Sequence, residues 1–496
     1  MVLISLMDSR ERIEIEILNL LDSEVRWWSA NELSCYTGYS SGTINKYLKF
    51  LQTKIARCCS SQAILEVSNK GSYLYKSDNF SIRGITQEII GESITVSIME
   101  KILLNQVNSM ASIQEICHIS EASARRKLKV IKKFLVKSDL KLVDLTVGIQ
   151  GDEMKIRIFY FNFFWQLYHG ESWPFQHIDH EKIRSTVTQI EQKVSGGSGF
   201  YFTLEMEYWL AINSYRNRKN SHLEITEKYE ILISDKKQIP IFSYYLKKNK
   251  VFLTDANNEA IWLSIVWDNL KEDYNYWEFL LNNCEYDNKD SFLQTQLIIE
   301  EFEKFFSHKI PQGLKKDLNV KLNYVHLIQE IFNSDFMLGE NYQYFREIKL
   351  LHPGFHEKCK RFVSHARKEN ILDVKNEELI IINYLLVCEG VFFLSRFDQK
   401  IKIKLVTDTG ILATQLLGNT LLHAFQNSYA LEIINDDSFY DLCLTTYSNL
   451  ENKNKNKIVT INSVLRERDI KNIDVAIDEI LVEQRGKKHY LDLINQ

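Results

Sequence analysis

The hydrophobic pattern of residues 112–137 predicts a short helix, a break at His118–Ser120 and a longer helix. In the longer helix, apolar residues recur at spacings of three and four, as on a helix with one buried face; they are Leu128, Ile131 and Leu135. Basic residues crowd the remaining surface: Arg125, Arg126, Lys127, Lys129, Lys132, Lys133 and Lys137. This is the build of a helix-turn-helix, whose second helix lies in the DNA major groove. The alternative is a solvated basic face on an ordinary surface helix.

The same pattern occurs earlier, after a predicted helix at 10–22. Ser29 is placed to cap a short helix anchored by Leu33, and a turn at 37–40 contains Gly38. The next helix, 41–57, has Ile44, Leu48 and Leu51 on its apolar side and Lys46, Lys49, Lys54 and Arg57 on its surface. Residues 63–75 then alternate as a hairpin around Asn69-Lys70-Gly71. A helix-turn-helix followed by a hairpin is a winged helix.

The second helix-turn-helix is also followed by strand-like residues, at 140–143 and 147–149, with Gly151 at a turn. The apolar residues of 158–168 are nearly continuous, which predicts burial on several sides. We therefore expect a second winged helix that leads into a buried helix.

From residue 159 to about residue 400 the pattern is almost entirely helical. The predicted helices are 182–194, 204–215, 257–267, 291–306, 322–332, 355–369 and 377–393. Their extent suits two bundles in series that divide near 287–290. The most apolar run, 379–394, is too short for a membrane span and contains Asn383 and Glu389, so we expect it to be a buried helix.

After Phe397 strands alternate with a helix. Strand patterns at 401–406, 430–434, 442–446 and 458–461 accompany a turn at 407–410 and a helix at 412–425. This alternation predicts a small α/β domain with a mainly parallel sheet.

Composition adds a charge asymmetry. The chain has 496 residues, 45% hydrophobic and 25% charged, with a formal charge of -4. Residues 1–150 contain 19 basic and 16 acidic residues, or +3, and the remainder contains 42 and 49, or -7. The 8 cysteines have no zinc-ligand spacing, and the amino end has no signal-peptide core. These features predict a cytoplasmic protein with a mildly basic head on an acidic body.

The order of these parts resembles the Mga/RofA/AtxA-type transcription regulators of Gram-positive bacteria. The pieces that carry the likeness are Gly151-Asp-Glu-x-x-Ile-Arg157, the paired basic helix-turn-helices, and the stretch Leu405–Thr414. The resemblance implies a multidomain, mainly α protein of five domains: winged helices at 1–80 and 81–158, helical phosphotransferase-system regulation domains at 159–288 and 289–398, and an enzyme IIB-like α/β domain at 399–496.

The last domain departs from a true enzyme IIB. Those enzymes have a phosphorylatable cysteine directly after the first strand, where this chain has Thr407 followed by Asp408. Neither side chain offers a thiolate, and the carboxylate would repel a phosphate. We therefore expect no catalysis and no cofactor, and the resemblance implies that this domain forms a homodimer.

Regulation domains of this kind are similar to targets of histidine phosphorylation by phosphocarrier proteins. The candidates are His222, which follows Arg216, Arg218 and Lys219, and His326 and His365, both within helical patterns. Each is alternatively an ordinary surface or core histidine. The pairs His177/His180 and His352/His356 have no third ligand that would make a metal site.

The interpretation is a cytoplasmic DNA-binding transcription regulator, of the global or virulence-activator type, with no membrane association. Promoter DNA would be contacted by residues of both helix-turn-helices: Thr43, Asn45, Lys46, Lys49, Arg57, Ser123, Arg125, Arg126, Lys129, Lys132, Lys133 and Lys137. The alternatives are a phosphotransferase-system phosphocarrier or enzyme IIB-type protein, and an assembly protein whose basic helices are mere surface.

Overall fold

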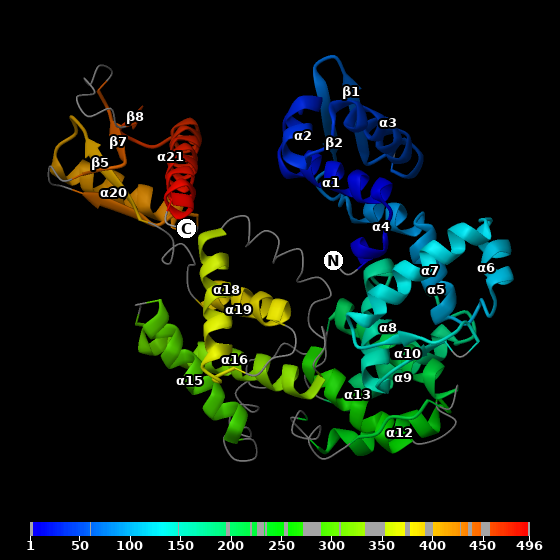
Figure 1. The fold of residues 1–496 in the computed structure, drawn as a ribbon. Helices are drawn as coiled ribbons and strands as arrows, with labels where there is room; N and C mark the ends of the chain where they lie inside the picture. Colours follow the sequence, from blue (N-terminus) through cyan, green and yellow to red (C-terminus); the bar gives the residue numbers. More distant parts are fainter. Residues whose placement is uncertain are drawn as a thin grey trace. The chain divides into compact units, whose positions relative to one another are not determined.

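The computed structural model describes most of the chain and divides into two compact units. The first unit is Met1–Asn283 with Ile328–Tyr342, and the second is Cys284–Leu327 with Gln343–Gln496. The described residues are 3–59, 61–146, 148–194, 199–218, 221–225, 233, 236–251, 256–270, 289–306, 309–332, 353–372, 377–391, 400–426, 428–434, 439–447 and 457–494. Within these ranges the fold is mainly helical, with a small parallel sheet near the carboxyl end (Figure 1).

The first unit begins with a segment that confirms the predicted order of helices and hairpin. Its elements are η1 (Leu3–Leu6), α1 (Ser9–Ser23), α2 (Ala30–Thr37), α3 (Ser41–Cys58), β1 (Ala63–Ser68) and β2 (Gly71–Lys76). Ser29 caps α2 in a capping box with Glu32, and Gly38 ends it in a left-handed conformation. The two strands pair antiparallel. At Gly71, with a φ of +118°, a Cβ atom would lie 2.5 Å from the Trp28 carbonyl oxygen, so only glycine fits this turn.

The next segment repeats the arrangement. It comprises α4 (Arg83–Gly91), α5 (Ile94–Leu103), α6 (Met110–Cys117), α7 (Glu121–Val136), β3 (Lys141–Leu142) and β4 (Ile149–Gln150). His118 turns the chain between α6 and α7 with a φ of +52°. The hairpin strands are shorter than predicted, with two residues each. Val147, which was expected to begin the second strand, lies outside the described residues.

The other helices that the structure describes within residues 151–270 form a bundle around an aromatic core. They are α8 (Glu153–Tyr168), α9 (His180–Glu191), α10 (Phe200–Asn217), α12 (Gln238–Lys248) and α13 (Ala256–Leu270). As predicted, α8 is buried on nearly all sides. Phe161 stacks on Trp209 of α10, with ring centroids 4.4 Å apart. Helix α12 was not predicted.

Four further helices confirm predicted ones: α15 (Lys289–Phe305), α16 (Gln312–Phe332), α18 (Pro353–Lys368) and α19 (Glu377–Val391). They belong to the second unit, except that residues 328–332 of α16 are assigned to the first. Helix α16 starts ten residues before its predicted start at Leu322. The apolar run of α19 is largely buried, as expected. None of the helices in the ranges given above has the length and hydrophobicity that a membrane span requires.

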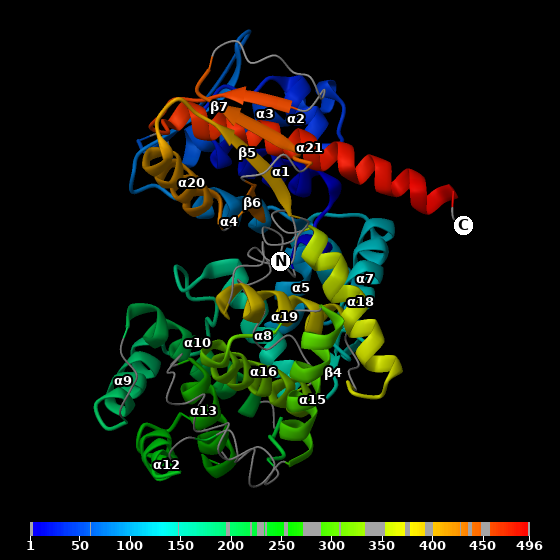
Figure 2. The same ribbon diagram turned by 90° about the vertical axis from the view of Figure 1, so that its left-hand side faces the viewer.

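The carboxyl-terminal elements confirm the predicted α/β pattern. Strands β5 (Ile401–Val406), β6 (Leu431–Ile434), β7 (Leu442–Thr445) and β8 (Lys457–Thr460) form a parallel sheet in the order β6-β5-β7-β8, with helices α20 (Ile411–Phe425) and α21 (Glu467–Ile494). The long helix α21 was not predicted (Figure 2). Its residues Ile473 and Ile477 join the core that contains Ile403 and Leu444.

Candidate nucleic-acid interface

Helix α7 is held by its apolar side and capped at its start. The Ser120 hydroxyl accepts a hydrogen bond from the backbone N–H of Ser123, at 3.3 Å, which satisfies one free amide of the first turn. Four residues at helical spacing are buried: Ala124, Leu128, Ile131 and Leu135. They seat α7 against α5 and α6 and leave the opposite side to solvent.

The solvent side of α7 carries the predicted basic residues: Arg125, Arg126, Lys129, Lys132, Lys133 and Lys137 are all exposed. Arg125 pairs with Glu121 one turn earlier, at 2.5 Å. Within the part of the chain that the structure describes, the other five have no carboxylate partner. Lys127 differs, because its ammonium contacts Asp8 and only 13% of its side chain is exposed. Helix α7 therefore presents a continuous face of positive charge from which Lys127 is excluded.

Helix α3 presents a smaller basic face. Lys46, Lys49 and Asn45 are exposed, and Thr43 is half-buried at the capped start of the helix. The Lys46 ammonium lies 5.6 Å from the Tyr47 ring centroid and 5.9 Å from that of Phe50. These contacts hold the lysine along an aromatic surface without neutralising it.

Two basic residues of α3 are not free surface charges. Lys54 is buried, and its ammonium lies 2.9 Å from carboxylate oxygens of both Glu14 and Glu92. The prediction of Lys54 as a surface residue is wrong, because position 54 follows Leu51 by three and faces inward with it. Arg57 is exposed, but its guanidinium contacts Glu88 and lies 3.4 Å from Glu92. Binding DNA through Arg57 would require giving up these contacts.

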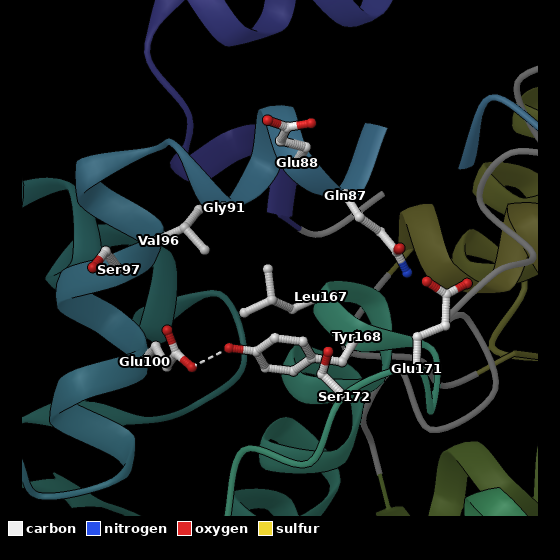
Figure 3. Close-up of a pocket in the computed structure, with 10 residues that line it drawn as sticks. All are labelled: Gln87, Glu88, Gly91, Val96, Ser97, Glu100, Leu167, Tyr168, Glu171 and Ser172. Carbon is white, nitrogen blue, oxygen red and sulfur yellow. Dashed lines mark hydrogen bonds between the residues drawn. The ribbon is translucent and has the colours of Figure 1, made fainter. Parts of the chain in front are cut away.

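A cavity of about 290 Å³ lies in the first unit between α4, α5 and the end of α8 (Figure 3). Its lining includes the carboxylates of Glu88, Glu100 and Glu171. The Tyr168 hydroxyl donates a hydrogen bond to Glu100, and burial together with this carboxylate raises the pKa of Tyr168. An acidic lining repels phosphate, so this cavity is not part of a DNA-binding surface.

The setting of His222 differs from the predicted one. Its ring is exposed, but Arg216 is buried and holds Glu153 with a 2.6 Å contact, and Arg218 donates to the His177 carbonyl. Lys219 lies outside the described residues. The two arginines of the predicted basic setting therefore already donate to nearby carboxylate and carbonyl oxygens.

The segment of His222 is attached to a buried ionic network. Arg157 of α8 donates to the Ser221 carbonyl at 3.1 Å and pairs with Glu259 of α13 at 2.6 Å. Arg157 also lies 2.9 Å from Glu153. The network joins α8, α10 and α13, and it fixes the backbone directly before His222.

His326 lies in the core of the second unit. Its Nδ1 lies 2.6 Å from the Thr295 hydroxyl and its Nε2 lies 2.6 Å from that of Tyr384. Burial lowers the pKa of His326 to about 4. The expectation of His326 as a phosphate acceptor does not fit this position, since both nitrogens are engaged where a carrier protein cannot reach them.

His365 is partly exposed on α18. Its Nε2 lies 3.0 Å from a carboxylate oxygen of Glu301, and its ring stacks on Phe305. Of the metal candidates, His180 lies 2.7 Å from Glu207 and His352 lies outside the described residues. Among the described side chains, no group of three is suited to holding a metal ion.

Thr407 lies where the sequence places it, at the carboxyl end of β5 and before α20. Its hydroxyl is 2.5 Å from that of Thr414, and Asp408 accepts a hydrogen bond from Thr446 at 2.8 Å. Cys443 on β7 is buried, and burial raises the pKa of its thiol. This strand-to-helix turn therefore contains hydroxyls and a carboxylate.

Comparison with known proteins identifies the segment around α7. Residues 78–164 match the family model described as the Mga helix-turn-helix domain. The chain is related to the Mga-type transcription regulators. The matched residues of this Mga domain run from the end of the first hairpin into α8 and include the whole of α6 and α7.

Several curated relatives are similar to this chain over most of its length. The capsule synthesis positive regulator AcpB of Bacillus anthracis is 21% identical over 94% of this chain and 98% of its own. The anthrax toxin expression trans-acting positive regulator of the same organism is 23% identical over 70% of this chain and 72% of its own. A putative trans-acting regulator of Streptococcus pneumoniae serotype 4 is 20% identical over 92% of this chain and 95% of its own.

The burial of His326 predicts a pH-dependent stability of the second unit. Its pKa is about 4 when folded and 6.5 otherwise, so below pH 6.5 the unfolded state gains a proton that the folded state does not. The stabilisation is complete above pH 6.5 and is lost as the pH falls toward 4, by about 3 kcal/mol in all. We expect hydrogen exchange of α16 and α19 to accelerate from pH 7 to pH 5, after correction for intrinsic rates.

The variant His326→Gln should lose this extra acceleration, because glutamine does not titrate. His365→Gln, which changes a histidine outside the core, is the matched control and should keep it. Equal pH dependence in the wild type and in His326→Gln would contradict the assignment.

Proposed function

We propose that the protein is a cytoplasmic DNA-binding transcription regulator, and that α7 is its main DNA-contacting helix. The observation that carries the proposal is the exposed basic face of α7, where five cations lack a carboxylate partner among the described residues. The Mga helix-turn-helix match over 78–164 and the printed names of the relatives as positive regulators support it. By analogy with them, the output is activation of transcription.

The chemistry of this face suits the DNA major groove. Lys129, Lys132, Lys133 and Lys137 would neutralise phosphates, whereas Arg126, near the start of the helix, would reach a guanine edge. On α3, Lys46 and Lys49 would add phosphate contacts, and Thr43 and Asn45 would face the groove. Arg125 would join only after exchanging its carboxylate partner for a phosphate. Arg57 was predicted as a phosphate contact, but its guanidinium is held by Glu88 and Glu92 and would stay with them.

We infer five domains within the two compact units. Residues 1–80 and 81–158 would be winged helices, 159–288 and 289–398 regulation domains of the phosphotransferase-system type, and 399–496 an enzyme IIB-like domain. The hairpins after α3 and α7, and the parallel sheet at the carboxyl end, support the first, second and fifth assignments.

We propose that phosphocarrier proteins modify the regulation domains at His222 and His365. His222 is exposed and His365 partly exposed, and they lie on different units. A phosphoryl group on His222 would add negative charge one residue from the carbonyl that Arg157 holds, and so would act on α8.

We further propose that the carboxyl-terminal domain forms a homodimer through α20. Ile411, Leu412 and Leu416 are 76%, 78% and 68% exposed at the start of this helix. Large apolar side chains gathered on one helix face are typical of an interface. Thr407 and its neighbours lack a thiolate, which favours this role over the alternative of a phosphotransferase-system enzyme.

Replacing Arg125, Arg126 and Lys129 together with alanine should weaken binding to promoter DNA by about 100-fold or more, because phosphate and base contacts are lost together. The slope of log affinity against log salt should also fall by about two to three. Gel shifts and fluorescence anisotropy at several salt concentrations measure both quantities.

The matched control replaces Lys193, Lys247 and Lys248, three exposed lysines of the first unit, with alanine. It removes the same charge and should leave the affinity within about threefold. If the two triple variants bind DNA equally well, α7 is not the DNA-contacting helix.

Labelled phosphoenolpyruvate with the general phosphotransferase-system carriers tests the regulatory proposal. We expect label that is lost in the double variant His222→Ala/His365→Ala and retained in His177→Ala, which removes another exposed histidine. Label within residues 399–496 would instead favour the enzyme alternative.

Replacing Leu412 and Leu416 with glutamate should raise the dimer dissociation constant by about 100-fold or more, since charges would enter an apolar interface. Sedimentation equilibrium measures this constant. The variant Val464→Glu/Val475→Glu places the same charges on exposed valines elsewhere in the domain and should remain dimeric. A dimeric Leu412/Leu416 variant would exclude α20 as the interface.

A further inference from the structure

The two helix-turn-helix segments of the first unit meet at a cluster of charged side chains. The cluster comprises Arg10 and Glu14 of α1, Lys54 and Arg57 of α3, and Glu88 and Glu92 at the end of α4. Helices α1 and α3 belong to the first segment and α4 to the second, and α4 packs against both (Figure 1). The cluster therefore spans the junction between the segments.

Lys54 is the centre of this cluster. Its side chain is 4% exposed, and its ammonium bridges Glu14, which is fully buried, and Glu92. Arg10 lies 2.9 Å from the other oxygen of Glu14 and 3.5 Å from Glu92. A buried ion pair resists separation, because pulling one partner away leaves a charge without compensation. Glu92 is the partner of Lys54 that the second segment contributes.

A second contact joins the two segments near the amino end of the first segment. Leu3 and Leu6 of η1 are buried, and η1 packs against α5 and α7 of the second segment. Lys127 of α7 contacts Asp8, and the Leu3 backbone N–H donates at 3.4 Å to the Gln166 side chain of α8, the helix that follows the second segment. The first segment is thus held to the second both through η1 and through the charged residues of α1 and α3.

We propose that Lys54 and Arg57, held by Glu88 and Glu92, lock the two helix-turn-helix segments into one rigid body, so that α3 and α7 meet DNA at a fixed separation. These residues act as positioning residues for DNA recognition. The DNA half of this inference rests on the proposed function, whereas the rigid junction does not.

The double variant Glu88→Gln/Glu92→Gln tests the junction without removing ion pairs inside the first segment. It removes the carboxylates that α4 offers to α3, while the pairs of Glu14 with Lys54 and Arg10 remain within the first segment. Glu88 and Glu92 have side chains 27% and 34% exposed, so their amides keep contact with water. Asp22→Asn is the matched control, because it breaks the contact of Asp22 with Lys76 inside the first segment only.

Double electron–electron resonance measures the distance between the two segments in the absence of DNA. Nitroxides are attached through a keto amino acid at Thr53 of α3 and Val136 of α7, both exposed, which avoids the native cysteines. The labelled chain is diluted with unlabelled chain, so that only distances within one molecule contribute. We expect one narrow distance distribution in the wild type and in Asp22→Asn, and a broad one in Glu88→Gln/Glu92→Gln. A distance distribution that stays narrow in the double variant would overturn the proposal that Glu88 and Glu92 lock the two segments together.

A second measurement tests the fixed separation on DNA. The probe is a duplex that the wild type selects from a random-sequence pool, with about 5 bp, half a helical turn, inserted between two adjacent protected segments. The insertion should weaken wild-type binding about tenfold and the double variant's binding less than about threefold, because loosened segments can follow the rotated site. Equal losses in both would overturn the fixed separation. If the wild type selects no duplex, the proposed function fails, and the spin-label distances still decide the junction.

Discussion

The cost of removing an unpaired charge from water decides where the basic residues of this protein act. Leaving a buried charge without its partner costs about 3–5 kcal/mol, so a buried cation must have one. Lys54 and Arg157 meet this condition with two carboxylates each. On α7, by contrast, cations such as Lys129 and Lys133 are hydrated, and a phosphate backbone can replace their water. The same residue types therefore hold the fold together in one place and form an exposed, unpaired basic face in another.

Helix α8 connects the second helix-turn-helix segment to the helical bundle that follows it. The matched Mga helix-turn-helix residues end inside it, at 164, and its aromatic side chains form the core of the adjoining bundle. Its first two turns contain Glu153 and Arg157, which fasten it to α10 and α13. Through Arg157, which donates to the Ser221 carbonyl, the backbone before His222 is attached to the helix that follows the second hairpin. No separate linker lies between the two parts.

In the second unit, large apolar residues are likewise buried in one place and exposed in another. In α19 the leucines and isoleucines are largely buried, whereas at the start of α20 Leu412 and Leu416 remain exposed. Helix α20 covers the sheet with Leu417, Leu421 and Phe425 instead. The turn before it contains Thr407 and Asp408. Helix α20 therefore buries one side in the core of the domain and leaves large apolar residues exposed at its start.

The sequence by itself determined most of the helices and strands and the chemistry of the basic face of α7. Local periodicity and capping residues such as Ser29 and Ser120 marked both helix-turn-helices, because helix starts and amphipathic faces depend on neighbours within a few residues. Helix α21 was missed, since its burial depends on a sheet distant in the sequence. Only the tertiary structure decided that Lys54 is buried against Glu14 and Glu92, that His326 is enclosed by Thr295 and Tyr384, and that Arg216 is already paired. The partners that set the environment of these side chains lie 31 to 63 positions away in the sequence. Local spacing of residues does not predict such distant contacts.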